Sequence, residues 1–326
     1  MTMNSLGELA DVIGQYKDVT IIGHLNPDGD TLGSTLALGL GLQQLGKQVV
    51  MVNRDKVPGI YRFLPGAEEL VTPEPRHFQE RLIIFVDCTD TRRSGDEVSE
   101  LLGQASCIVN IDHHISNEMF GQYNHVDTEA AAAGTVIWAL LKELGVKPDA
   151  RMATCVYVAL VTDTGSFRYT NTNANCHHVA AELFQYGIEQ ETVNRELYEE
   201  VPLTSLEVVK VGLENLHISP DGRVAWIILT QETMDRLKAE DEHLEGVVNY
   251  AKSVKGVEVG LLFREAGSQL TKVSLRSKSL VNVSQLAAGF GGGGHARAAG
   301  CRVKDSLKQA VEKVVKAAVE AAQVKI

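Results

Sequence analysis

Residues 19–45 read VTIIGHLNPDGDTLGSTLALGLGLQQL, and this stretch decides the fold expected for the first half of the chain. It opens with Val19–Gly23, a short apolar run rich in β-branched residues, which predicts a strand buried on both faces. After a polar loop, the pattern of Thr31–Leu45 predicts a helix. Gly29 and Gly33 indicate that the backbone here passes close to another group. A strand that leads directly into a helix is the repeating unit of an α/β fold.

The alternation of strands and helices continues to about residue 190. Further short apolar runs predict strands, and longer segments that end near Gly145 and Gly187 predict helices. The strands are Gln48–Asn53, Leu82–Val86 and Cys107–Ile111, and the helices are Ala130–Leu144, Ala150–Val161 and Cys176–Tyr186. We therefore expect the first domain to be α/β, with a doubly wound, mainly parallel sheet.

The pattern changes after residue 190. Residues 191–215 begin with a polar, charged segment that Pro202 interrupts, and they predict a linker with a connecting helix at Thr204–Leu216. Beyond the linker we expect strands at Val224–Leu229, Val257–Phe263 and Thr271–Leu275, and helices at Val283–Ala288 and Lys304–Ala322. The sequence thus predicts a first domain at 1–190, a linker at 191–215 and a smaller α/β domain at 216–326.

Composition excludes several classes of protein. With 326 residues, 44% of them hydrophobic, the chain has ample material for a core, whereas its net charge of −11 argues against a basic surface that grips long nucleic acid. The charge is uneven, since residues 251–304 carry nine Lys and Arg against two Glu. No run approaches the ~18 apolar residues of a membrane helix. The five cysteines show no paired spacing, and the N-terminus does not resemble a secretory signal, so we expect a cytoplasmic protein.

Four polar clusters in the first domain follow apolar runs, and we expect them at strand ends. They are His24–Asp30, Asp87–Asp90, Asp112–His114 and, after Val156–Val161, Asp163–Gly165. Because the carboxyl ends of parallel strands share one edge, where ligands bind, the clusters should meet there. Their carboxylates and imidazoles suit Mn²⁺ or Mg²⁺, with Zn²⁺ and Co²⁺ as alternatives. A single Asp at such a place is most often a cap or turn residue, and Asp30 alone would be read as the N-cap of the following helix, so the joint occurrence carries the prediction.

A second segment that carries chemistry lies near the C-terminus. The glycines of Gly291–Gly294 allow successive backbone N–H groups to converge on an anion, and His295 follows them directly. Arg276, just after a predicted strand, has a guanidinium fork that can clamp a phosphate. Four glycines alone would predict a flexible loop, but His295 and Ala298–Gly300 favour an anion site.

These motifs together resemble a known family. The four motifs of the DHH phosphoesterase superfamily are similar to four groups in this sequence: His24-x-x-x-Asp28-x-Asp30, Asp87, Asp112-His113-His114 and Asp163. The glycine-rich signature of the DHHA1 domain is similar to Gly291–Gly300, GGGGHARAAG. Order and spacing match over nearly the whole chain, and its size resembles the NrnA-type branch of oligoribonucleases and pAp phosphatases.

The resemblance implies a site for two divalent metal ions, with Mn²⁺ favoured and Mg²⁺ or Co²⁺ as alternatives. One ion would be bound by His24, Asp28 and Asp87, and the other by Asp30, Asp87, His113 and Asp163, with Asp87 bridging the two. His114 would face the substrate phosphate or the leaving group, and Asp112 would orient the histidines. The implied catalytic residues are thus His114, Asp87 and Asp112.

The resemblance to DHHA1 implies that the far end of the substrate is bound by the second domain, with the active site in the cleft between the domains. The residues implied for this role are Arg276, Ser277, Gly292, Gly293, Gly294 and His295.

The implied function is hydrolysis of short RNA oligonucleotides to 5′-mononucleotides and removal of the 3′-phosphate of pAp, by a water activated between two metal ions. The nearest alternative is the same chemistry on linear or cyclic dinucleotides or on inorganic polyphosphate. A non-catalytic nucleotide or RNA sensor is less favoured, because every implied ligand residue is present. Expected partners are short RNA, pAp and related small nucleotides, with no long nucleic acid and no membrane, and a homodimer is left open.

Overall fold

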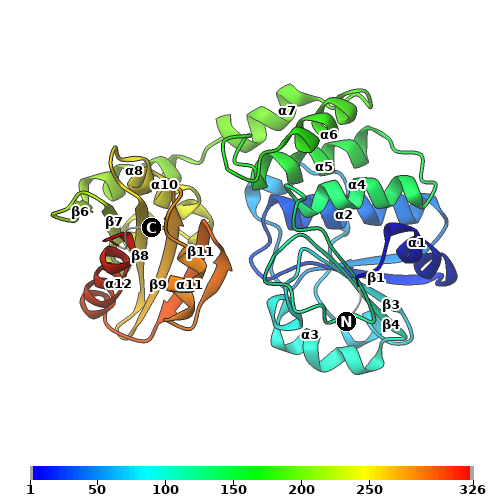
Figure 1. Ribbon diagram of the computed structural model, residues 1–326, viewed down its shortest axis with the longest axis horizontal. Helices are drawn as coiled ribbons and strands as arrows, with labels where there is room; N and C mark the ends of the chain where they lie inside the picture. The colour runs from blue at the N-terminus through cyan, green and yellow to red at the C-terminus, as the bar shows by residue number, and fades with distance from the viewer. Residues whose placement is uncertain (1–2, 324–326) are drawn as a thin grey trace. The chain divides into compact units, whose positions relative to one another are not determined.

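The computed structural model describes residues 3–323, apart from the side chain of His295. The chain divides into two compact units, Met1–Glu200 and Val201–Ile326, which are described separately below (Figure 1). The boundary falls inside the segment 191–215 predicted as a linker. Within residues 3–323, no helix is long and apolar enough to cross a membrane.

The first unit is built on a five-stranded sheet with the order β2-β1-β3-β4-β5. All its neighbouring strands are parallel, as the sequence predicts. The strands are β1 (Asp18–Ile22), β2 (Gln48–Val52), β3 (Leu82–Val86), β4 (Cys107–Asp112) and β5 (Tyr123–Val126). The central strand β3 is buried along its whole length, which explains its unbroken apolar sequence. The edge strand β5 lacks such a signal and was not predicted.

Helices cover both faces of this sheet. They are α1 (Leu6–Gln15), α2 (Gly29–Gln44), α3 (Asp96–Leu101), α4 (Ala133–Glu143), α5 (Ala150–Asp163), α6 (Ala174–Phe184) and α7 (Gln190–Asn194), followed by a π-helical turn, Arg195–Glu199. Figure 1 shows α2, α4 and α5 on one side of the sheet and α3 on the other. Helix α2 packs on both α4 and α5, and its residues from Gly29 to Leu42 are all buried. A helix that is apolar all round is typical of such a central position.

Two element boundaries differ from the prediction in ways that affect the polar clusters. Helix α2 begins at Gly29, because the Asp28 carboxylate caps it by accepting the N–H groups of Asp30 and Thr31. Asp28, and not Asp30, is therefore the N-cap. The helix predicted to end at Val161 continues to Asp163, so the fourth cluster lies at a helix end and the expectation of a strand end is wrong.

The second unit contains a six-stranded mixed sheet with the order β10-β11-β9-β8-β7-β6. Its strands are β6 (Leu216–Ile218), β7 (Val224–Leu229), β8 (Val259–Gly267), β9 (Leu270–Ser277), β10 (Gly293–His295) and β11 (Ala298–Val303). Its helices are α8 (Leu203–Glu214), α9 (Gln231–Leu237), α10 (Val247–Ser253), α11 (Val283–Ala288) and α12 (Leu307–Gln323). One apolar core lies between the sheet and α11 and α12, and a second lies under α8, α9 and α10. The unit is a second α/β layer structure, as expected.

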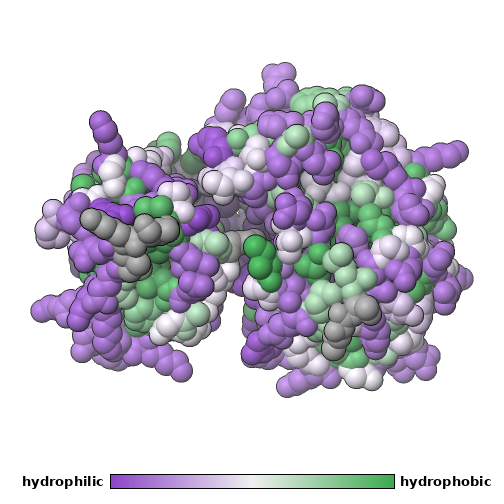
Figure 2. All heavy atoms as spheres, viewed as in Figure 1, coloured by the Kyte–Doolittle hydropathy of each residue, from purple (hydrophilic) through white to green (hydrophobic). Residues whose placement is uncertain are grey.

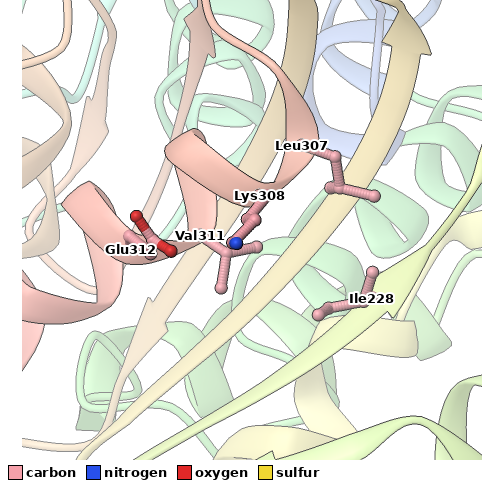
Figure 3. A pocket seen from close by; sticks show the side chains of 5 residues that line it. All are labelled: Ile228, Leu307, Lys308, Val311 and Glu312. Atoms are coloured by element: carbon pink, nitrogen blue, oxygen red, sulfur yellow. The ribbon is translucent and has the colours of Figure 1, made fainter.

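On the face shown in Figure 2, hydrophilic residues dominate and apolar residues form small groups. A hollow of about 350 Å³ beside the start of α12 is lined by Ile228, Leu307, Lys308, Val311 and Glu312 (Figure 3). Its lining contains one carboxylate, that of Glu312, and no histidine.

Candidate metal centre

The predicted clusters converge at the carboxyl edge of the sheet in the first unit. His24 follows β1, Asp87 follows β3, and Asp112 ends β4, which are three neighbouring strands. Asp30 comes from the first turn of α2, and Asp163 from the last turn of α5. Because α2 and α5 pack against each other, the two helix-borne carboxylates join the three strand ends.

One group of possible ligand atoms consists of His24, Asp28 and Asp87, all within 4.8 Å of one another. The His24 Nε2 atom lies 3.4 Å from Oδ2 of Asp87 and 3.7 Å from Oδ2 of Asp28. The Nδ1 atom of His24 lies 2.7 Å from the carbonyl of Leu25. A carbonyl only accepts, so Nδ1 donates to it, and Nε2 is the ring nitrogen directed at the group.

A second group consists of Asp30, His113 and Asp163, again within 4.8 Å. The His113 Nε2 atom lies 3.5 Å from Oδ2 of Asp30 and 3.8 Å from Oδ2 of Asp163. It also lies 3.6 Å from Oδ1 of Asp87, while its own Nδ1 is 3.2 Å from the carbonyl of Ala130. The Asp87 carboxylate therefore faces the first group with one oxygen and the second group with the other.

Asp87 shows the strongest sign that this centre fits a cation. Its side chain is 3% exposed, and its Oδ1 atom has no hydrogen bond of standard geometry within the described residues, although Nε2 of His113 and Nδ1 of His114 lie 3.6 Å and 3.5 Å from it. Its φ of +59° lies in the left-handed region, which non-glycine residues adopt rarely and often at functional sites. A buried carboxylate oxygen without a donor is costly unless a positive charge approaches it. The possible ligand atoms are carboxylate oxygens and imidazole nitrogens, a set that binds divalent metal ions. The residues therefore fit a metal.

The pKa values reflect the crowding of charge. Burial lowers the pKa of His24, but its interactions with Asp28 and Asp87 outweigh this and raise it to about 10. Burial raises the pKa of Asp163 to about 6, and burial together with the charge of Asp87 raises the pKa of Asp30. Burial would also raise the pKa of Asp87, but its interactions with His113 and His24 hold it well below the ordinary value. The carboxylates thus compete for positive charge that bound cations would supply.

A third arrangement holds His114. Its Nδ1 atom lies 2.7 Å from Oδ1 of Asp112, which is fully buried. The same oxygen accepts the N–H of His113, and the other accepts the side-chain amide of Asn117 at 2.6 Å. With both oxygens engaged, the Asp112 carboxylate has a fixed orientation and fixes the imidazole of His114 in turn.

The remaining ligand candidates are also held by neutral donors. Asp30 accepts the N–H groups of Ala133 and Gly134 at the start of α4, and the hydroxyl of Ser34. Asp163 accepts the side-chain amide of Asn171 at 3.1 Å. The roles of four supporting residues were not predicted: Thr31, Ser34, Asn117 and Asn171. Their only sequence signal is a hydroxyl or amide within eight positions of a ligand candidate, which is too common to be selective.

In the second unit, Gly293 and Gly294 of the glycine-rich segment belong to strand β10, which pairs with β11 through Gly293 and Gly300. A Cβ at Gly292 would lie 2.2 Å from the carbonyl oxygen of Gly300, and one at Gly294 would lie 2.5 Å from that of Ala298. These two glycines therefore have a packing reason as well as the predicted binding role. Four successive glycines, which alone are typical of a flexible loop, can therefore also mark a strand pair that leaves no room for side chains.

The other residues predicted to bind substrate lie near this strand pair. Arg276 is half-buried on β9, opposite Ala298 of β11. Ser277 is buried and donates its hydroxyl to the carbonyl of Val281 at 2.6 Å. The side chain of His295 lies outside the described part of the structure.

Comparisons with known proteins identify the family of each unit. Residues 18–160 match the DHH family, N-terminal domain, and residues 225–323 match the DHHA1 domain. The bifunctional oligoribonuclease and PAP phosphatase NrnA of Thermus thermophilus is 33% identical over 92% of this chain and 88% of its own length. The protein of the same name in Bacillus subtilis is 27% identical over 91% and 92%. An exopolyphosphatase-related protein of Bacteroides fragilis has a similar structure, with a TM-score of 0.88, 25% identity and coverage of 98% and 95%.

Proposed function

Since this chain belongs to the DHH family of phosphoesterases, we propose that its substrates are short RNA oligonucleotides and pAp. It would cleave the first to 5′-mononucleotides and remove the 3′-phosphate from the second. The observation that carries the proposal is the buried carboxylate and histidine centre, in which Asp87 faces His24 with one oxygen and His113 with the other. Relatives that align over about nine-tenths of the chain and bear the name of this activity support the choice of substrates.

The proposed cofactor is a pair of divalent metal ions, with Mn²⁺ favoured and Mg²⁺ or Co²⁺ as alternatives. His24, Asp28 and Asp87 would hold one ion, and Asp30, Asp87, His113 and Asp163 the other. Bound there, such ions lower the pKa of water and stabilise charge on phosphoryl oxygens. The chain's own task is to hold the ligands in place. The N–H of Asp30 donates to Asp28, the N–H of Ala133 donates to Asp30, and the side-chain amide of Asn171 donates to Asp163.

We assign to His114 the contact with the leaving oxygen. Its Nδ1 donates to Asp112 at 2.7 Å, which fixes the ring and leaves Nε2 as the nitrogen for substrate. A positioned imidazole of this kind assists departure of an alkoxide by hydrogen bonding or proton donation. Asp112 is then a positioning residue, in the role that a carboxylate often has behind a working histidine.

The second unit is proposed to recognise the remainder of the substrate. The residues assigned to this are Arg276, Ser277, Gly292, Gly293, Gly294 and His295. Arg276 offers a planar fork for a second phosphate, and residues 251–304 carry the local excess of Lys and Arg. With an overall charge of −11, the chain has little basic surface for long nucleic acid. We further propose a cytoplasmic location. A measurement of molecular mass in solution would distinguish a monomer from a homodimer.

A second candidate substrate is inorganic polyphosphate. It is favoured by the Bacteroides fragilis structure, which is described as exopolyphosphatase-related and superposes with a TM-score of 0.88. The chemistry at the reacting phosphorus would be the same, and only the contacts beyond it would differ.

One turnover panel tests these proposals. Purified full-length protein is given di- to pentaribonucleotides, short DNA, pAp, linear and cyclic dinucleotides and polyphosphate, each with Mn²⁺ and with Mg²⁺. We expect the highest kcat/KM for short RNA and pAp, and no turnover after chelation. Preferred turnover of polyphosphate would replace the substrate assignment, and an inactive protein across the whole panel would contradict the proposed function.

A further inference from the structure

Thr31 contacts two of the proposed metal ligands, which come from different loops of the chain. Its backbone N–H donates to Oδ1 of Asp28 at 3.0 Å, and its hydroxyl donates to Oδ2 of Asp87 at 2.6 Å. The side chain is fully buried in the first turn of α2. Asp28 precedes this helix and Asp87 follows β3, so Thr31 links the ends of two neighbouring strands.

The direction of the Thr31 hydroxyl is fixed by packing. A Cβ added at Gly23 would lie 2.2 Å from Cγ2 of Thr31, so the methyl group occupies the space that a side chain at position 23 would fill. Threonine has few allowed χ1 rotamers in a helix. With the methyl group placed against Gly23, the hydroxyl is directed to Asp87 and not to the preceding turn of the helix.

This hydrogen bond determines which oxygen of Asp87 remains available. Thr31 engages Oδ2, whereas Oδ1 has no hydrogen bond of standard geometry within the described residues and faces Nε2 of His113 at 3.6 Å and Nδ1 of His114 at 3.5 Å. Loss of the hydroxyl would let the carboxylate rotate away from a bridging position.

We propose that Thr31 is a positioning residue for the bridging carboxylate of Asp87 and thereby sets the affinity of the centre for divalent metal. The inference rests on the proposed function, because it takes the centre to bind metal. Neutral donors behind metal ligands typically change affinity by about 10- to 100-fold when removed. Thr31 acts through its hydroxyl, so an isosteric residue without that group should lose the effect.

The chain provides a matched control one turn further along α2. Thr35 is also buried, at 1% exposure, and its hydroxyl has no hydrogen-bond partner within the described residues. Replacement of either threonine by valine keeps the shape and removes one hydroxyl. Only the change at Thr31 removes a contact with a ligand, so a difference between the two variants reports that contact.

The experiment measures Mn²⁺ binding to metal-stripped, full-length protein by isothermal titration calorimetry, without substrate, for wild type, Thr31→Val, Thr31→Ser and Thr35→Val. We expect Thr31→Val to bind Mn²⁺ about 10- to 100-fold more weakly and Thr35→Val to stay close to wild type. Thr31→Ser should lose less than Thr31→Val, because it keeps the hydroxyl but not the methyl group that directs it. The same dissociation constant for Thr31→Val and wild type would overturn the inference, as would an equal loss in Thr31→Ser.

The same titration distinguishes failure of the proposed function from failure of the role assigned to Thr31. Wild-type protein that binds no Mn²⁺ would overturn the proposed function itself, whereas tight binding by both wild type and Thr31→Val would overturn only the role of Thr31. If Thr31→Val does not fold, Thr31→Ala is compared with Thr31→Ser by the same titration. Wild-type affinity in Thr31→Ala would then contradict the inference, and weak binding rescued by serine would support it.

Discussion

The Nε2 atom of His113 lies 3.6 Å from Oδ1 of Asp87, and the Nε2 atom of His24 lies 3.4 Å from Oδ2 of the same carboxylate. Asp87 and His113 follow neighbouring parallel strands, β3 and β4, so the relationship is a direct product of the sheet. It places one buried carboxylate within reach of two imidazoles that belong to different ligand groups. The proposed two-metal chemistry depends on this shared position.

Replacement of His114 should separate chemistry from metal binding. We expect His114→Ala to lower kcat on a diribonucleotide by about 10²- to 10⁴-fold, the usual contribution of a positioned acid or base. Mn²⁺ affinity measured by calorimetry should stay close to wild type, because His114 is assigned to the substrate and not to the metal. A large loss of Mn²⁺ affinity would instead make His114 a ligand.

Asp112 should act through His114. We expect Asp112→Asn to lower kcat by about 10- to 100-fold, less than the loss in His114→Ala, because the imidazole stays but loses its fixed orientation. Once His114 is absent, the change at Asp112 should have little further effect on kcat. Additive losses in the double variant would show that Asp112 has a separate role.

The fold could be predicted from sequence where burial is complete. Strands β3 and β7 match their predicted limits because each is a short apolar run with clear ends. Strands β5, β6 and β10 were missed because they are short or polar, and helices α9 and α10 because each has only seven residues. Such elements owe their structure to tertiary contacts more than to local pattern.

The part of the metal centre that could be predicted is the part that the order of strands and helices positions. Strand ends at one edge explain how His24, Asp87 and His113 meet, and these residues were found from the alternation of strands and helices. Asp163 arrives through helix packing instead, and the hydrogen bonds of Thr31 and Asn171 depend on side-chain geometry. No spacing in the sequence encodes these contacts.

The two adjacent glycines at 292 and 293 should differ in their tolerance of a side chain. We expect Gly292→Ala to destabilise the protein by about 1–3 kcal/mol, because its Cβ would overlap the carbonyl of Gly300. Gly293→Ala is the matched control, since a Cβ there meets no described atom within 4 Å. Urea unfolding measures both variants, and equal losses would contradict the packing explanation.

Glu258 should make the stability of the protein depend on pH. Burial alone would raise its pKa, but the N–H groups of Val281, Ser279 and Leu280 donate to the carboxylate and lower the pKa below the ordinary value of 4.5. A carboxylate with a lowered folded pKa adds stability that is present above 4.5 and is lost as pH falls through the folded value.

Glu258→Gln should therefore cost about 1–2 kcal/mol of unfolding free energy at pH 7, and the gap to wild type should narrow below the ordinary carboxyl pKa. Urea unfolding at a series of pH values measures the gap. Glu207→Gln, an exposed change in α8, serves as the control and should show no such dependence. A gap that stays constant down to acid pH would contradict this explanation.

The most direct test of the two-metal account is Mn²⁺-dependent turnover of a diribonucleotide by wild type and by Asp87→Asn, with Asp11→Asn in the exposed part of α1 as the control. Loss of the shared carboxylate should remove several kcal/mol of metal-assisted stabilisation, so we predict that kcat/KM falls by about 10³-fold or more. The circular dichroism spectrum should be unchanged, and Asp11→Asn should match wild type. Full activity in Asp87→Asn would contradict the central claim.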